Sequence, residues 1–182
     1  MPTPPPRPAT LAAPAPPTPE AETVGLGGGC HWCTEAVFQA LRGVQRVDQG
    51  WIASRAPHDA PSEAVLVHFD PREIPLRVLV EAHLLTHAST SDHAMRGAYR
   101  SAVYALSDAQ AAEATRILEE IRAETGEAYV TRVLPFAGYA PGYARFQDYY
   151  RTRPDAPFCQ TYIAPKLARL RREFGAHAAP EA

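Results

Sequence analysis

The sequence lacks any long apolar run. No stretch approaches the roughly 18 consecutive apolar residues that span a bilayer, and the N-terminus has no charged segment followed by an apolar one. We therefore expect neither a membrane span nor a secretory signal. Neither sign of charge dominates, because 18 basic residues are balanced by 20 acidic ones. This balance argues against a nucleic-acid or anionic-membrane partner.

Cysteine is scarce as well. The chain of 182 residues has three, Cys30, Cys33 and Cys159. An odd number, with two of the three only three residues apart, does not fit the disulfide framework of a secreted domain. We infer a reducing, cytoplasmic setting in which thiols are kept for chemistry. Lysine is scarcer still, since 17 of the 18 basic residues are arginine.

Proline, by contrast, is concentrated at one end of the chain. Residues 1–21 hold nine prolines and almost nothing to bury, which predicts a disordered or polyproline-like leader. We assign residues 22–176 to a single domain, because this length allows one domain with a proper core. Residues 177–182 are predicted to be a flexible tail.

Strands and helices alternate within the predicted domain. Apolar runs and alternating patterns predict strands at 22–26, 44–52, 63–69, 99–106 and 129–133. Helical spacing, together with capping and stop signals, predicts helices at 30–42, from 75 onward, at 107–126 and at 165–174. Residues 135–143 are predicted to form a loop, and Cys159, which follows two prolines, to lie on an extended connection. The alternation favours a two-layer α/β sandwich.

The most informative stretch runs from Gly27 to Glu35 and reads Gly-Gly-Gly-Cys-His-Trp-Cys-Thr-Glu. Three glycines let the backbone turn sharply, and apolar residues at helical spacing follow, so Cys30 falls where a helix begins. The partial positive charge of a helix N-terminus favours a thiolate over a thiol. We interpret Cys30 as a nucleophile.

Cys30 and Cys33 form a C-x-x-C pair, which can cycle between dithiol and disulfide. A thioredoxin-like fold would place this motif after a βαβ unit, but only one predicted strand precedes it. A zinc site needs about four ligands, and no second C-x-x-C accompanies His31 or His87. A third interpretation makes Cys30 the nucleophile and a second cysteine its resolver. A fourth treats both as buried, inert thiols.

The stretch Gly-Gly-Gly-Cys-His-Trp-Cys-Thr-Glu-Ala-Val-Phe-Gln resembles the signature of the A-type peptide methionine sulfoxide reductases. That signature typically reads Gly-Gly-Cys-Phe-Trp, then Gly or Cys, then a Glu. The similarity continues in order over residues 22–174, through short blocks that begin at Glu63, Phe69, Thr86, Tyr99, Phe146, Pro157 and Ile163. With this resemblance we predict an α/β (α+β) two-layer sandwich with a ferredoxin-like core, a mixed sheet flanked by helices and a loop-rich C-terminal part.

The resemblance implies thiol-dependent reduction of methionine S-sulfoxide, free or in proteins. A cysteine thiolate attacks the sulfoxide sulfur while an acid protonates its oxygen, and the cysteine becomes a sulfenic acid. By position, Cys30 matches the nucleophile and Glu63 the acid, which must be protonated to act. Tyr99 matches a phenol that hydrogen-bonds the sulfoxide oxygen, and Trp32 matches the aromatic wall that receives the methyl group.

The other two cysteines match recycling positions. Cys159 matches a C-terminal resolving thiol, and Cys33 a second recycling position found in some family members. The disulfide would be reduced by thioredoxin or another dithiol, with no other cofactor and no metal, and we expect a monomer. The alternative is a divergent relative that acts as a general thiol-disulfide oxidoreductase, or a non-enzymatic binding protein, with little sulfoxide reductase activity.

Two of the departures from the family pattern concern predicted substrate-binding residues. His31 stands where the family has phenylalanine, so half of the predicted methyl-binding wall is a polar, titratable ring. The family's aspartate position falls on Ala94, and Asp92, two residues upstream, is our candidate to replace it. His31 and Asp92 therefore join Trp32 as predicted substrate-binding residues.

Overall fold

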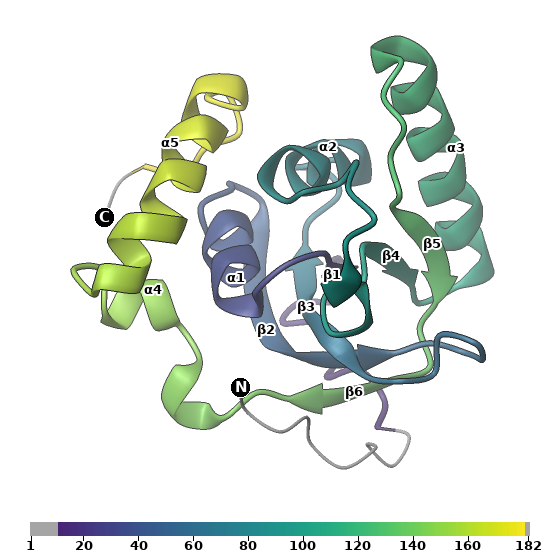
Figure 1. Ribbon diagram of the computed structural model, residues 1–182, viewed down its shortest axis with the longest axis horizontal. Helices are drawn as coiled ribbons and strands as arrows, with labels where there is room; N and C mark the ends of the chain where they lie inside the picture. The colour runs from purple at the N-terminus through teal and green to yellow at the C-terminus, as the bar shows by residue number, and fades with distance from the viewer. Residues whose placement is uncertain (1–10, 181–182) are drawn as a thin grey trace.

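The structure is a computed structural model that describes residues 11–180. A six-stranded mixed sheet runs through it in the order β5-β4-β1-β3-β2-β6 (Figure 1). The strands are β1 (Glu22–Gly27), β2 (Val44–Ala53), β3 (Ser62–Phe69), β4 (Ala102–Ala105), β5 (Arg132–Pro135) and β6 (Gly138–Pro141). The α-helices are α1 (His31–Gln39), α2 (Leu76–Thr86), α3 (Asp108–Thr125), α4 (Tyr149–Thr152) and α5 (Ala164–Glu173).

Four strands and two helices make the ferredoxin-like core. The chain runs β1-α1-β2-β3-α2-β4, and the strands lie in the order β4-β1-β3-β2 with every neighbouring pair antiparallel. β3 lies between β1 and β2, as expected for a mostly apolar strand. β6 extends the sheet antiparallel to β2, and β5 extends it parallel to β4. The predicted α/β sandwich with a mixed sheet is confirmed.

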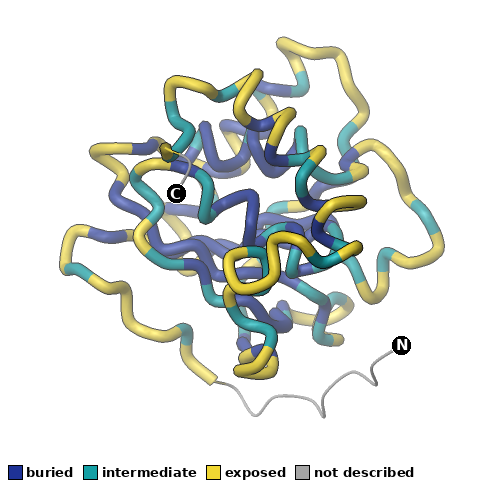
Figure 2. Tube along the Cα trace, turned by 90° about the vertical axis from the view of Figure 1, so that its left-hand side faces the viewer, coloured by how far each residue is buried: buried dark blue, intermediate teal, exposed yellow. Residues whose placement is uncertain are grey.

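The main core lies between the sheet and the helices. Val24, Val65 and Val103 point from three neighbouring strands into a cluster shared with α1, α2, α3 and α5. Because side chains alternate along a strand, Leu66 and Tyr104 point the other way, into a smaller cluster on the opposite face. Figure 2 shows the buried centre of the molecule in dark blue. The sheet is therefore buried on both faces, which fixes the register of β3 firmly.

Two local predictions are wrong. The segment predicted to be a loop at 135–143 contains β6, a short edge strand paired with β2, in which Pro141 is tolerated at the strand end. Cys159 does not lie on an extended connection. Pro157 begins a helical segment, and Cys159–Ile163 forms a π-helical turn that runs directly into α5. The prolines mark a helix start, where a missing N–H costs nothing.

The predicted leader and tail lie partly outside the described residues. Between residue 11 and β1 the chain has no helix or strand, and Arg46 donates a hydrogen bond to the carbonyl of Ala15 at 2.9 Å. At the other end, the N–H of Arg42 donates to the carbonyl of His177 at 2.8 Å. The leader, the tail and the domain boundaries stay predictions. None of the described helices combines the length and apolar character needed to cross a membrane.

The close approach of β2 and β6 gives a testable prediction. A Cβ at Gly50 would lie 2.1 Å from the carbonyl oxygen of Ala140, so Gly50→Ala must push the two strands apart. We expect a loss of roughly 1–3 kcal/mol in the free energy of unfolding. Gly97→Ala is the matched control, because nothing lies within 4 Å of its added Cβ. Equal urea-unfolding midpoints for the two variants would contradict this expectation.

Candidate active site

Cys30 lies at the N-terminus of α1, directly after β1 and the glycine turn. It is the N-cap residue and is half-buried, and its carbonyl accepts hydrogen bonds from the N–H and the hydroxyl of Thr34 at 3.2 and 3.1 Å. The turn needs glycine at Gly28, because a Cβ there would lie 2.5 Å from the ring of His87. The sequence thus places the sulfur at a helix start, as predicted.

The Cys30 and Cys33 thiols are free and hydrogen-bonded to each other. This hydrogen bond lowers the pKa of Cys33, and the positive charge of Lys166 lowers it further, against the effect of burial. The same hydrogen bond raises the pKa of Cys30, as do burial and the negative charges of Cys33 and Glu63. These effects favour negative charge on Cys33 over Cys30. The helix N-terminus alone does not decide which sulfur is ionised.

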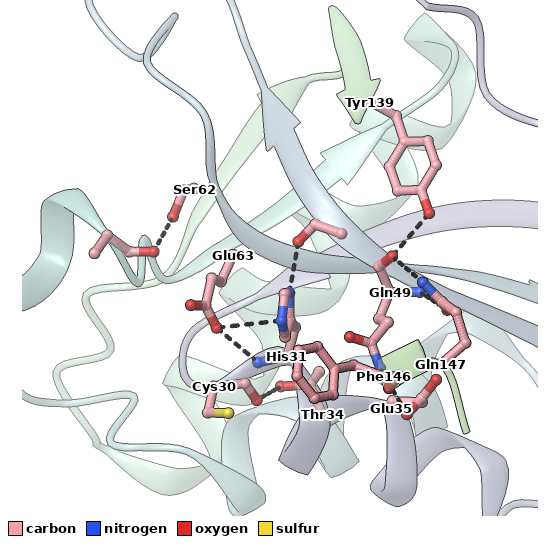
Figure 3. A network of polar contacts seen from close by, with 12 residues as sticks. Cys30, His31, Thr34, Glu35, Gln49, Ser62, Glu63, Tyr139, Phe146 and Gln147 are labelled. Carbon is pink, nitrogen blue, oxygen red and sulfur yellow. Dashed lines mark hydrogen bonds and ion pairs between the residues drawn. The ribbon is translucent and has the colours of Figure 1, made fainter. Parts of the chain in front are cut away.

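Glu63 is held over the start of α1. Its Oε2 accepts a hydrogen bond from the backbone N–H of His31 at 3.1 Å, and the Nε2 of His31 lies 3.9 Å from the same oxygen (Figure 3). The N–H of Glu63 donates to the carbonyl of Ala98 at 2.9 Å. β3 is thereby tied at its first residues to the segment that carries Tyr99.

Tyr99 lies close to both the acid and the nucleophile. Burial raises the pKa of its phenol, and the charges of Glu63 and Cys30 raise it further. Arg96 fastens this segment to the glycine turn by donating to the carbonyls of Tyr99 and Gly28, each at 3.0 Å. The structure therefore brings three of the predicted site residues together from α1, β3 and the segment before β4.

Asp92 is not brought to this group. It is exposed, and its charge acts on Arg96. Among the described residues, no hydrogen bond joins Asp92 to Glu63 or Tyr99. Arg96 turns its guanidinium toward backbone carbonyls of the loop, which leaves Asp92 on the solvent side. The structure therefore gives no support to Asp92 as a replacement for the family's aspartate.

His31 is buried, and contacts with β2 hold its ring in place. Its Nδ1 lies 2.9 Å from the carbonyl oxygen of Gly50 on β2, and its ring meets Trp51 edge to face at 5.1 Å. Trp51 is the cross-strand partner of Glu63 in the β2–β3 pair, so the indole and the carboxyl are neighbours. His31 thus links the acid to β2, a role that the sequence pattern did not predict.

Trp32 stands in a cluster of aromatic rings from the C-terminal part of the chain. Tyr149 stacks on its indole at 4.1 Å with 9° between the planes, and Phe146 and Phe158 pack against it at 5.1 and 5.5 Å. The predicted aromatic wall is therefore a group of four rings. Tyr149 covers one face of the indole, so a substrate methyl group would reach only the remaining surface.

The buried carboxylate of Glu35 holds this aromatic segment in place. It accepts hydrogen bonds from the backbone N–H groups of Asp148 and Tyr149 at 2.8 and 3.1 Å. It also accepts one from the side-chain amide of Gln49 at 2.9 Å (Figure 3). Burial raises the pKa of Glu35, and these hydrogen bonds oppose the rise. The sequence motifs did not predict this role. The available signal was a carboxylate among apolar residues on the inner side of a helix, which needs buried partners.

A cavity of about 240 Å³ lies beside the two thiols, between α1, α2 and the C-terminal helical segment. Its lining includes Cys30, Cys33, Tyr162 and Lys166. Lys166 donates a hydrogen bond to the carbonyl of Thr86. It is the single lysine of the chain. The scarcity of lysine in the sequence did not by itself predict a role for it. The lysine places a positive charge beside the thiol pair.

Cys159 is fully buried below this pair. Burial raises the pKa of its thiol, and the charge of Cys33 raises it further, so Cys33 and Cys159 lie close enough to interact. Between residues 11 and 180, no group of three or more His, Cys, Asp and Glu side chains is arranged to hold a metal ion. The zinc interpretation of the C-x-x-C pair gains no support.

A ferredoxin-like α/β domain with a hydrogen-bonded thiol pair beside a carboxyl and a phenol is suited to a thiol-dependent oxidoreductase. Comparison with known proteins is more specific. Residues 22–178 match the family model of the peptide methionine sulfoxide reductases. The chain belongs to this family, as its sequence motifs predicted.

Relatives of known sequence and structure agree. The peptide methionine sulfoxide reductase MsrA of Deinococcus radiodurans is 36% identical over 167 residues, covering 82% of this chain and 81% of the relative. The MsrA of Thermus thermophilus is 34% identical over 167 residues, covering 84% and 95%. Reduced Mxr1 from Saccharomyces cerevisiae has the same fold, with a TM-score of 0.69 at 22% identity over 81% of this chain and 94% of that one. Mxr1 has also been solved in complex with Trx2, with a TM-score of 0.58 at 23% identity over 74% and 88%.

The Glu35 network gives a second prediction. Glu35→Ala leaves two backbone N–H groups and the Gln49 amide without their acceptor, at a cost of roughly 1–3 kcal/mol for each buried group left unpaired. Glu35→Gln keeps one oxygen acceptor and should lose less. Glu119→Ala, at an exposed position of α3, is the control and should change the free energy of unfolding by under about 0.5 kcal/mol. Urea unfolding measures all three, and a Glu35→Ala variant as stable as the control would refute the role.

Proposed function

We propose that the protein reduces methionine S-sulfoxide, free or in proteins, with Cys30 as the nucleophile and Glu63 as the acid. Its membership of the peptide methionine sulfoxide reductase family supports the reaction. The observation that carries the assignment of residues is the convergence of Cys30, Glu63 and Tyr99 at the start of α1. A thiol-disulfide oxidoreductase without sulfoxide chemistry would need neither the acid nor the phenol.

In the first step the Cys30 thiolate attacks the sulfoxide sulfur. Cys33 takes the proton of Cys30 through their hydrogen bond, which moves the negative charge to the attacking sulfur. A protonated Glu63 carries no charge, so one of the effects that raise the pKa of Cys30 is removed. Glu63 protonates the sulfoxide oxygen, and Tyr99 donates a hydrogen bond to it. The oxygen passes to Cys30 as a sulfenic acid, methionine leaves, and Glu63 is left as a carboxylate.

In the second step Cys33 resolves the sulfenic acid. Its sulfur attacks the Cys30 sulfur, the S–O bond breaks, and the hydroxyl leaves as water with the proton that Cys33 carried. Oxygen thus leaves as water, and two thiols become one disulfide. The hydrogen bond between the thiols and the charge of Lys166 support Cys33, rather than the buried Cys159, as the direct resolver.

In the third step the disulfide moves from Cys30–Cys33 to Cys33–Cys159. The thiolate of Cys159 attacks Cys33, releases the thiol of Cys30 and forms a Cys33–Cys159 disulfide, which thioredoxin or another dithiol then reduces. The interaction between Cys33 and Cys159 supports this order, and the complex of Mxr1 with Trx2 supports a protein partner for a chain of this fold. No other cofactor and no metal enter this scheme. We further propose that the protein acts as a monomer in the cytoplasm, where reducing conditions keep its three thiols free.

The reaction is tested with dabsyl-methionine S-sulfoxide and dithiothreitol. We expect the wild-type protein to form dabsyl-methionine, Cys30→Ser to form none above background, and Cys159→Ser to stay active, because dithiothreitol can reduce a Cys30–Cys33 disulfide directly. Formation of product by Cys30→Ser at the wild-type rate would contradict the assignment of Cys30 as the nucleophile. An inactive wild-type protein would contradict the proposed reaction itself.

The order of the thiols is tested with one equivalent of sulfoxide and no reductant. We expect Cys33→Ser to accumulate a sulfenic acid that dimedone traps, because the sulfur hydrogen-bonded to Cys30 is gone. Cys159→Ser should form the Cys30–Cys33 disulfide but turn over slowly with thioredoxin as the reductant. Peptide mass spectrometry identifies both products. A trapped sulfenic acid in Cys159→Ser, with none in Cys33→Ser, would reverse the order.

A further inference from the structure

His31 contacts the acid Glu63 through both its backbone and its side chain. The backbone N–H donates to Oε2 of Glu63 at 3.1 Å, and the ring Nε2 lies 3.9 Å from the same oxygen. The side chains of His31 and Glu63 are only 9% and 15% exposed. The ring and the carboxyl therefore face each other with little water around them, and Figure 3 shows them side by side.

The other ring nitrogen determines which protonation states are possible. The carbonyl oxygen of Gly50 can only accept a hydrogen bond, so the Nδ1 of His31, 2.9 Å away, carries a proton. In a neutral ring the Nε2 is then a bare lone pair, and it faces the Glu63 carboxyl. A bare lone pair beside a carboxylate repels it. The contact is attractive only when one proton is shared, either as carboxylic acid with imidazole or as carboxylate with imidazolium.

We propose that His31 is a positioning residue that holds the proton Glu63 donates, and that it returns a proton to Glu63 after each reduction. This inference rests on the function proposed above. Reduction of one sulfoxide leaves Glu63 as a carboxylate beside neutral imidazole. The imidazole is then protonated at Nε2 by solvent and passes this proton to Oε2, which restores the acid and the neutral imidazole. One proton thus enters from solvent for the one that Glu63 contributes to the water formed.

The surroundings of the ring favour this role over a methyl-binding one. Trp51 packs edge to face on the ring, and the Gly50 hydrogen bond fixes its orientation. A ring whose nitrogen faces a carboxyl offers little apolar surface to a substrate methyl group. The titratable groups around the pair are Cys30 and Cys33 on α1, Tyr99 on the segment before β4, and Tyr143, whose ring packs on Trp51. Lys166 faces the thiols from α5 and not the carboxyl.

The test is a pH profile of the single-turnover rate of methionine formation, measured on pre-reduced protein without added reductant. His31→Gln can still donate a hydrogen bond to Gly50 but cannot carry an extra proton. His31→Phe keeps a ring against Trp51 and adds an apolar surface. An imidazole ordinarily loses its proton near pH 6.5 and a carboxyl near pH 4.3. We expect the alkaline limb to move to lower pH in both variants, so that the ratio of the rates at pH 6 and pH 8 rises about fourfold.

The sulfoxide concentration that gives half the maximal rate separates the two roles. We expect His31→Phe to leave this half-saturating concentration unchanged or to lower it, while the pH profile shifts as described. His58→Gln, in the loop between β2 and β3, is the control for loss of a histidine outside the site and should match the wild type. A wild-type pH profile in His31→Gln would overturn the inference and leave the reductase activity intact. An inactive wild-type protein would instead refute the proposed function.

Discussion

The hydrogen bond from the backbone N–H of His31 to the carboxyl of Glu63 is the contact on which the site depends. The first N–H groups of a helix have no partner within the helix, and a carboxyl oxygen can accept a hydrogen bond from one of them whether or not the carboxyl is ionised. Here one such N–H is satisfied by an acid from the central strand. Helix α1, which begins at Cys30, and strand β3, which carries Glu63, are thereby joined within one residue of Cys30.

α1 is fixed at a second point by another carboxylate. Glu35 lies one turn further along and binds the backbone of Asp148 and Tyr149, which places Tyr149 on the indole of Trp32. One short helix thus contacts the acid through its N-terminus and the aromatic layer through its buried side. This explains how the segment between β6 and α4, which has little regular structure, is held next to α1.

The core and the proximity of Cys30, Glu63 and Tyr99 were predictable because both leave local patterns in the sequence. The glycine turn before Cys30 and the apolar run after Glu63 each specify an element and its place in the chain, and the family resemblance connected them to Tyr99. The partners of Glu35 could not be predicted, because they come from backbone N–H groups more than a hundred residues away. The same holds for the loop around Asp92, because Arg96 in this loop donates to the carbonyl of Gly28, 68 residues away. The prediction of an extended connection at Cys159 was wrong because a proline can begin a helix as readily as it ends one.

The aromatic packing has one more consequence. The chain has only two tryptophans, and both lie at the site. Trp32 follows Cys30 and stacks on Tyr149, while Trp51 meets the ring of His31 and is the cross-strand partner of Glu63. All the indole emission of the protein therefore originates within the catalytic neighbourhood. Intrinsic fluorescence therefore reports on this region without an added label, with Trp32 next to Cys30 and Trp51 next to His31 and Glu63.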